Sequence, residues 1–336
     1  MPSGISHMLL SQNISFDTDI SYKPKLLYNT RFFQIGSIAP DFPYGSIADD
    51  KFLEDENHLA NLFHFTAESQ RVDQSPNIIP LRGLELVKSI VQQPNAKARQ
   101  TDALFWFLAG YASHVIADGI CHPFVMDKVG RYEGANKAQH RALEIGLDVL
   151  LFKHFTSDSG KSIEASYAGK DIVINSFNER IHTDFILEHF KSLIELVYEY
   201  QVEVAEMKGW VSGISRLFSL ATGKWPVWFR KLDATTPFVF REISDLEGKE
   251  DDYLVLRKPK FWDENFLNRA IINFVNDCLP LFNKLMSSFL NKAYAFVYES
   301  GPALTINELP AFSLDTGRTV NDPNNIVLKP MLWEAV

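Results

Sequence analysis

Cysteine is scarce in this chain, which contains only Cys121 and Cys278 among its 336 residues. Two cysteines cannot build a disulfide framework, so a small secreted scaffold held together by disulfides is excluded and a reducing compartment is compatible. Cys121 lies inside the most informative stretch of the sequence. We expect it to be a buried thiol rather than a metal thiolate.

A targeting segment and a long hydrophobic run are also missing. The first residues, MPSGISHMLLSQNIS, have neither a basic start nor a long apolar stretch, so no signal peptide is predicted. No uninterrupted apolar run approaches the roughly 18–20 residues that a membrane-spanning helix needs. The longest candidate, residues 271–296, is broken by asparagines, Asp277, Pro280 and Lys284. We therefore expect a cytoplasmic protein without a transmembrane segment.

Positive charge is in the minority, with 33 Lys and Arg against 42 Asp and Glu and a formal net charge of -9. This balance argues against a nucleic-acid-binding surface over the whole molecule and leaves only a local basic patch open. Hydrophobic residues make up 46% and aromatic residues 13%, which is typical of a folded globular protein. The length allows one large domain or two, with a sizeable core.

The most informative stretch closes a long apolar run that starts at residue 103. Residues 110–124 read GYASHVIADGICHPF, in which His114, Asp118 and His122 are spaced four apart. On a helix these side chains form one stripe, and zinc accepts both imidazole and carboxylate ligands. Because Pro123 disfavours the helical conformation at the residue before it, we expect the helix to end at His122 or in the turn that follows.

A second polar pair with the same interval follows in residues 139–152, QHRALEIGLDVLLF. His140 and Glu144 lie in a segment whose leucines recur every four residues, which predicts an amphipathic helix. A single histidine is more often a packed, hydrogen-bonded residue than a ligand. Two such pairs on successive apolar helices instead predict a metal site that includes His114, Asp118, His140 and Glu144.

Three further candidates precede this region. His7 lies in SHMLLSQNI, which reads as the first turns of a helix. Asp41 lies in IGSIAPDFPYG, a proline-punctuated loop whose fixed backbone suits a ligand or a catalytic base, although aspartate is also common in turns. His64 lies between two phenylalanines, so it is a better candidate for an inward role than His58.

Helical patterns dominate the rest of the chain, so we predict an all-α multi-helix fold with long loops. Helices are expected over residues 81–93, 183–207, 213–221 and 267–298. The remaining expectations are a linker over 156–162, a candidate short strand within 163–176, an exposed loop over 232–259 and an irregular tail after 301. We predict a helical domain over residues 1–155 and a mainly helical C-terminal region over residues 156–336, and the two can pack as one domain.

The order of the segments SHMLL, IGSIAPDFPYG, FHF, GYASHVIADGICHPF and HRALE resembles the zinc-dependent phospholipase C family. This family belongs to the broad superfamily that includes single-strand-specific zinc nucleases. The resemblance covers roughly residues 1–155. It implies an all-helical fold and a cluster of up to three zinc ions held by His, Asp and Glu side chains.

The resemblance also implies a role for each candidate. The implied ligands of one zinc are His64, His114 and Asp118. Asp41 would be a further ligand of that ion or the base that orients the attacking water. The implied ligands of a second zinc are His122, His140 and Glu144. A third ion would be held by Asp118 together with His7.

Three functions are compatible with these patterns. We favour a zinc-dependent phosphodiesterase that acts on a phospholipid head group or a related small phosphodiester, with two or three zinc ions that activate water. A nuclease is the second, and the acidic balance and the lack of a basic, aromatic groove count against it. The third is a helical metal-binding protein without turnover, which a closed and fully coordinated site would favour. Peripheral contact with a membrane is compatible with the first.

Overall fold

The computed structural model of the protein describes residues 4–17, 22–46, 57–64, 71–130, 136–157, 180–221, 223, 225–232, 234, 239–257, 271–306, 308–309, 311 and 313–314. Over these residues the fold is mostly helical with one two-stranded antiparallel sheet, which confirms the predicted all-α class. The elements are α1 (Gly4–Asp17), α2 (Lys23–Tyr28), α3 (Thr30–Gly36), the 3-10 helix η1 (Ala39–Gly45), α4 (Asn57–His64), η3 (Val72–Gln74), α5 (Ile78–Val91), α6 (Ala98–Val129), α7 (Asn136–Ser157), α9 (Arg180–Tyr198), α10 (Val204–Ala221), α11 (Val227–Arg230), α12 (Ile243–Leu246), α13 (Glu250–Leu254), β1 (Val255–Arg257), β2 (Ile271–Asn273), the π-turn η4 (Phe274–Cys278) and α14 (Leu279–Tyr298).

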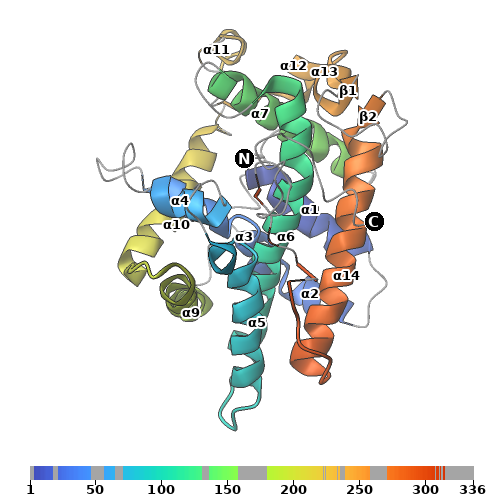
Figure 1. Cartoon of the computed structure of the whole chain (residues 1–336). Coiled ribbons are helices and arrows are strands. Elements are labelled where there is room, and N and C mark those ends of the chain that lie inside the picture. The colour runs from blue at the N-terminus through green and yellow to red at the C-terminus, as the bar shows by residue number, and fades with distance from the viewer. Residues whose placement is uncertain are drawn as a thin grey trace.

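Helix α6 runs through the middle of the fold and organises the core. Figure 1 shows α5 and α14 alongside it and α7 near its upper end, while α1, α3 and α9 also pack against it. Every residue from 103 to 127 of α6 is buried, among them Trp106 and its two phenylalanine neighbours. A helix that is apolar on all sides is stable only where other helices surround it, so α6 is the core of the protein.

By length and composition α6 is the one helix, within the part of the chain that the structure describes, that could cross a membrane. An 18-residue window in it has a mean hydropathy of 1.3, yet that window is 100% buried inside the protein, as expected of a core helix. The polar side chains of His114 and Asp118 interrupt its apolar run. For that reason a count of uninterrupted apolar residues does not reveal it.

The predicted end of the central helix at His122 is wrong, because α6 continues through Pro123 to Val129. Proline removes one backbone hydrogen bond and its ring crowds the carbonyl four residues earlier, which here belongs to Gly119. The surrounding core outweighs that local cost, since residues on both sides of the proline are buried. The helix ends instead at Gly130, whose φ of 89° is a conformation that glycine readily adopts.

Two glycines allow α3 to approach α6 unusually closely. A Cβ on Gly36 would overlap the backbone of Phe107, and a Cβ on Gly110 would overlap the backbone of α3. This contact places the turn after α3 directly beside α6, where the carbonyl of Ser37 reaches His114. The glycines therefore position part of the polar site described below.

The helix predicted over residues 183–207 is wrong at its C-terminal end. Helix α9 ends at Tyr198, Glu199 follows with a φ of 55°, and α10 begins only at Val204. A non-glycine residue in the left-handed region cannot continue a right-handed helix, which explains the break.

The helix predicted over residues 213–221 begins earlier than expected, because Gly213 lies in the middle of α10 rather than at its start. A Cβ on Gly213 would overlap the carbonyl of Gly45 in η1. The residue is thus a point of close contact between α10 and η1, not a helix boundary.

The C-terminal predictions also need correction. The helix predicted over 267–298 begins later, with the π-helix η4 at Phe274 that leads directly into α14, because Asn273 ends β2 and its side chain accepts hydrogen bonds from two backbone amides of η4. The predicted exposed loop over 232–259 contains α12, α13 and β1, and its Leu246 and Leu256 are buried. The predicted strand within 163–176 lies outside the described residues, as does the predicted linker after residue 157.

Candidate metal centre

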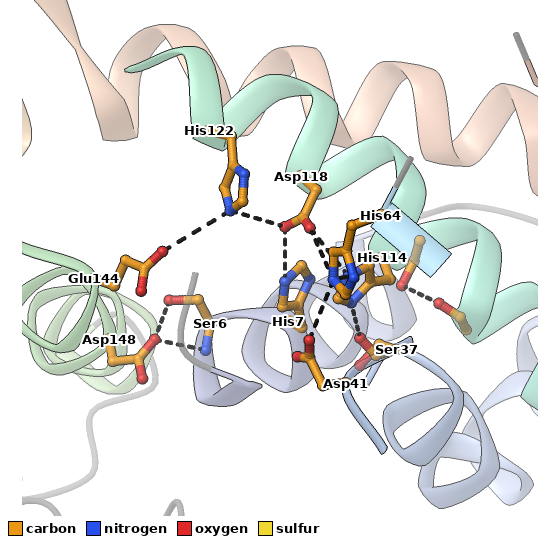
Figure 2. Close-up of polar contacts among 12 residues, drawn as sticks. Ser6, His7, Ser37, Asp41, His64, His114, Asp118, His122, Glu144 and Asp148 are labelled. Carbon is orange, nitrogen blue, oxygen red and sulfur yellow. Dashed lines mark hydrogen bonds and ion pairs between the residues drawn. The ribbon is translucent and has the colours of Figure 1, made fainter. Parts of the chain in front are cut away.

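The eight side chains predicted as ligands gather in one buried region between α1, η1, α4, α6 and α7. Figure 2 labels all of them except His140. Each is at most 3% exposed; they are His7 on α1, Asp41 in η1, His64 at the end of α4, His114, Asp118 and His122 on α6, and His140 and Glu144 on α7. Buried histidines and carboxylates in such number are rare unless they are paired or bind metal ions. The spacing of four along α6 and α7 explains why both helices present them on one face.

Asp118 occupies the centre of the cluster, and its two oxygens face different groups. Oδ2 lies 3.1 Å from Nε2 of His114 and 3.7 Å from Nε2 of His64. Oδ1 lies 3.0 Å from Nε2 of His7 and 3.8 Å from Nε2 of His122. The carboxylate therefore stands between two pairs of histidines, His114 with His64 and His7 with His122, as Figure 2 shows.

The first set contains Asp41, His64 and His114, and backbone carbonyls fix the tautomers of both histidines. Nδ1 of His114 lies 2.9 Å from the Ser37 carbonyl, and Nδ1 of His64 lies 2.7 Å from the Ala60 carbonyl. Because a carbonyl only accepts, each Nδ1 carries the proton and donates it. In the neutral rings both Nε2 atoms are then bare, although they lie only 3.2 Å apart.

Two bare lone pairs at that distance repel each other unless a proton or a cation lies between them. A carboxylate stands on each side, since Oδ1 of Asp41 is 3.3 Å from Nε2 of His64 and Oδ2 of Asp118 is 3.1 Å from Nε2 of His114. Donor atoms of one tetrahedral zinc ion lie ~3.3 Å apart when its bonds are about 2.0–2.1 Å long. The spacing and the donor types of this set therefore fit one zinc ion.

The second set contains His122, His140 and Glu144. Nε2 of His140 lies 3.1 Å from Oε1 of Glu144, and Nε2 of His122 lies 3.9 Å from the same oxygen. The Gly130 carbonyl, 3.3 Å from Nδ1 of His140, favours the same tautomer as in the first set. Because α6 continues past Pro123, His122 stays one turn from Asp118 and faces α7.

The carboxylates of the cluster stay ionised despite their burial. Burial alone would raise the pKa of Asp118, but the imidazoles of His114 and His122 hold it well below its ordinary value. The pKa of Asp41 is lowered in the same way, because His114 and His64 outweigh burial. Such buried negative charge is stable only with a positive partner, and a divalent cation is the natural one.

His7 joins the two sets at the centre. Its ring stacks on His114 with the centroids 4.0 Å apart, and burial together with His114 lowers the pKa of His7 to about 4, so this ring is neutral at physiological pH. His7, His114 and Asp118 form a third group whose donor atoms lie within 4.8 Å of one another. His114 has only one nitrogen available, so a third ion would take His7 and Asp118 as its donors from the described residues.

A hydrogen-bond account of the same atoms supports a metal. Among the described residues, neither oxygen of Asp118, nor Oδ1 of Asp41, nor either ring nitrogen of His7 has a partner with hydrogen-bond geometry. Buried polar atoms almost always have one, so a set of unpaired atoms at ligand spacing is typical of a cation site. The described residues therefore fit zinc.

Comparison with known proteins decides the family. A sequence profile described as "Zinc dependent phospholipase C" matches residues 6–200, more than half of the chain. The chain belongs to the zinc-dependent phospholipase C family. All eight predicted ligands lie within the match, which extends past residue 155, where the resemblance in the sequence ended. No curated protein and no solved structure matches the chain. The predicted division of the chain into a domain over residues 1–155 and a C-terminal region over residues 156–336 stays a prediction.

One polar contact beside the metal centre was not predicted from the sequence. Asp148, one turn beyond Glu144 on α7, accepts hydrogen bonds from the backbone N–H of Ser6 at 2.9 Å and from the Ser6 hydroxyl. Both residues are buried, and burial raises the pKa of Asp148 well above its ordinary value, which favours the uncharged carboxyl. The continued spacing of four after His140 and Glu144 was the sequence signal for it.

Proposed function

We propose that the protein is a zinc-dependent phosphodiester hydrolase that acts on a phospholipid head group or a related small phosphodiester. One observation carries this proposal: in a buried cluster, the bare Nε2 atoms of His64 and His114 each lie within 3.7 Å of an ionised carboxylate, that of Asp41 or Asp118. Membership of a zinc-dependent phospholipase C family supports the metal and the reaction class.

The donors divide between two ions that share Asp118. The first ion would be held by Asp41, His64, His114 and Oδ2 of Asp118. The second would be held by His122, His140 and Glu144, with Oδ1 of Asp118 on the same side. His7 adds one donor beside Oδ1, so it supports either a third ion or the second one. Two or three zinc ions are therefore proposed.

Zinc at these positions would supply Lewis-acid activation of water and neutralise charge on the phosphoryl oxygens. The chain's own contribution is orientation. The carbonyls of Ser37 and Ala60 keep the Nδ1 protons of His114 and His64 in place, so that both Nε2 atoms face the centre. Asp41 is ionised and at the edge of the first set, so its carboxylate can accept a hydrogen bond from the attacking water and orient it, in addition to serving as a ligand.

Complete burial of the cluster favours a second candidate function, a metal-binding helical protein without turnover. Closed, fully coordinated zinc sites are structural, whereas catalytic sites keep one position open to water. The first set and Oδ2 of Asp118 together offer four donors, which is enough to close a tetrahedral site. Turnover, rather than metal content, therefore separates the two candidates.

The test begins with the metal content of purified, zinc-supplied protein, measured by mass spectrometry. The double variant His114→Ala/Asp118→Ala removes the shared carboxylate and one further donor of the first ion. A matched control, His189→Ala/Asp184→Ala, changes a half-buried helical histidine and an exposed aspartate on α9, away from the cluster. We expect two or three equivalents of zinc in the wild type and in the control, and a loss of at least one equivalent in the first variant.

Activity follows on a chromogenic phosphodiester, on phosphatidylcholine and on a single-stranded oligonucleotide. Turnover of the first two that the control variant keeps and the His114/Asp118 variant loses is the expected result. Zinc binding without turnover of any of them would instead establish the non-catalytic function. A wild type that carries no zinc after supply would overturn both.

A further inference from the structure

Apolar side chains are concentrated on the surface over the described residues 220, 221, 223 and 225–232, which we call the 220–232 platform. Nine large hydrophobic side chains are exposed among the described residues, and four of them lie in this short segment. They are Leu220 (61% exposed), Val227 (53%), Trp228 (68%) and Leu232 (45%). Single exposed hydrophobic residues need no explanation, but a cluster with an exposed tryptophan marks an interaction surface.

The platform is ordered rather than a loose loop. The rings of Trp225 and Phe229 stack with their centroids 4.8 Å apart, and Trp228 packs edge-on against Phe229 at 5.7 Å. Nε1 of Trp225 donates a hydrogen bond to the Leu220 carbonyl at 2.8 Å. These contacts use Trp225 and Phe229 as a base, so that Trp228 is left facing outward.

Arg230 fixes this base to the body of the protein. Its guanidinium is buried and forms ion pairs with Asp245 at 2.8 Å and Glu242 at 3.0 Å, and it also donates to the Trp225 carbonyl at 2.7 Å. Asp245 lies on α12, which packs against α7, the helix of His140 and Glu144. The platform is therefore anchored, through α12, to a helix that bears part of the metal centre.

The other end of the platform continues from α10, which approaches α1. A Cβ on Gly4 of α1 would meet the ring of Phe218, so this ring contacts α1 three residues before His7, and it lies two residues before the platform in the chain. The Phe240 amide donates a hydrogen bond to the Ala221 carbonyl at 2.8 Å, which ties the start of the platform to the residues just before α12. Both attachments thus lead to elements that carry candidate zinc ligands.

We propose that the 220–232 platform binds the surface of a phospholipid bilayer or micelle. Tryptophan with neighbouring aliphatic side chains is favoured at the boundary between head groups and acyl chains. Basic side chains flank the apolar ones, Lys231 next to Leu232 and Arg216 one helical turn before Leu220, which suits anionic head groups. Figure 1 shows α11 at the outer end of the molecule, as insertion into a surface requires.

A second copy of the chain is a poorer occupant. A stable protein interface takes about 20–30 residues from each partner, more than this short segment contains. The proposal rests on the proposed function only in one respect, since an enzyme that acts on lipid aggregates must hold to their surface. Binding itself does not require turnover, so the two can be tested separately.

The test compares two double variants on vesicles of phosphatidylcholine with and without an anionic phospholipid. Val227→Ser/Trp228→Ser removes the outermost platform side chains. Leu27→Ser/Leu196→Ser is the matched control, because it removes two side chains of similar exposure, 44% and 67%, from α2 and α9. We expect the vesicle partition coefficient to fall by about tenfold or more in the platform variant and by less than about twofold in the control.

Three further measurements make the outcome decisive. Brominated phosphatidylcholine should quench the tryptophan fluorescence of the wild type and not of the platform variant, and the wild-type result does not depend on how any variant folds. The Asp118→Ala variant should bind vesicles like the wild type. The platform variant should keep its turnover of a soluble chromogenic phosphodiester and lose only its turnover of vesicles. If the protein has no phosphodiesterase activity, the wild type should still bind vesicles, so the two proposals fail separately.

Equal vesicle binding by the platform variant and the control, or no quenching in the wild type, would overturn the proposal. A wild type that sediments as a dimer, with a monomeric platform variant and no vesicle binding, would overturn it in favour of self-association.

Discussion

The metal centre and the 220–232 platform break the usual rule of burial in opposite directions. Asp118 is a charged side chain that is fully buried, whereas Trp228 is a large aromatic side chain that is 68% exposed. Each arrangement raises the free energy of the protein alone, and each is relieved by something outside the chain: a cation in one case, an apolar surface in the other. Departures from ordinary burial therefore point to ligands, and the sign of the departure indicates their chemistry.

The largest effect is expected from a substitution in the metal centre. Asp118→Asn keeps the size of the side chain but removes the negative charge that both sets share. Because outer-shell partners of a metal already contribute about 10–100-fold, we expect the loss of this shared donor to lower turnover by more than ~100-fold and to remove at least one equivalent of zinc. Mass spectrometry and a phosphodiesterase assay would check it.

Ser113→Ala is the matched control for Asp118→Asn, because Ser113 is a buried neighbour on α6 whose hydroxyl donates to the Gly110 carbonyl. We expect this variant to keep its zinc. A similar loss of zinc in both variants would mean that disruption of α6, rather than of the donor set, is responsible.

Chelation of the metal should have the next largest effect. Without a cation, the ionised Asp41 and Asp118 are left beside bare histidine nitrogens in a buried site, so the folded state is destabilised. Bound zinc at about 1,000 times its Kd stabilises a fold by about 4 kcal/mol. We expect a chelator to lower the Tm in a calorimetric scan. A Tm that does not respond in the wild type would contradict the metal site, as would an equal response in His114→Ala/Asp118→Ala.

Much of the metal centre could be predicted from the sequence, and the reason is geometric. Residues four apart share a helical face, so His114, Asp118 and His122, and later His140 and Glu144, were visible as stripes. His7, Asp41 and His64 have no such internal spacing, because they come from three other elements. Their role was predictable only from the resemblance to a family of zinc-dependent enzymes.

The remaining features depend on tertiary contacts that a local pattern does not contain. Pro123 predicted a helix end, but the packing of the core carried α6 past it. Gly213 marked a close approach to Gly45 rather than a helix start. The exposure of Trp228 was equally hidden, since an aromatic residue near a short turn reads as core until its neighbours are known.

A moderate effect is expected from the contact that holds α1 against α7 beside the metal centre. Asp148→Ala leaves the buried amide and hydroxyl donors of Ser6 without this acceptor, which costs about 1–3 kcal/mol of stability. Because His7 is the next residue, we also expect weaker zinc binding, by about tenfold. Titration with a zinc-sensitive dye would measure the affinity.

The conservative variant Asp148→Asn sharpens this prediction. An amide oxygen can accept both hydrogen bonds from Ser6, and an uncharged side chain suits this buried position. We expect it to restore most of the zinc affinity. If Asp148→Asn binds zinc as weakly as Asp148→Ala does, the contact with Ser6 does not position His7.

The smallest effect is expected from the ion pair between Arg230 and Asp245, which anchors the 220–232 platform. Burial would raise the pKa of Asp245, but the hydrogen bonds from Arg230 and from the Glu242 backbone N–H, together with the positive charge of Arg230, outweigh it and lower that pKa below its ordinary value. A carboxyl with a lowered folded pKa contributes stability above its unfolded pKa, about 3.9, and this contribution disappears as pH falls through the folded pKa. Asp245→Asn should therefore cost about 1–2 kcal/mol at neutral pH.

Urea unfolding of the wild type and Asp245→Asn at a series of pH values measures that contribution. The difference in unfolding free energy between the two proteins should be constant from neutral pH to about pH 5 and should shrink only below about pH 4. Asp251→Asn, which breaks an exposed pair with Arg257, is the control and should show little difference at any pH. If Asp245→Asn also weakens vesicle binding while its zinc content is unchanged, the anchor matters for the exposed side alone. The two departures from ordinary burial would then be separable parts of one protein.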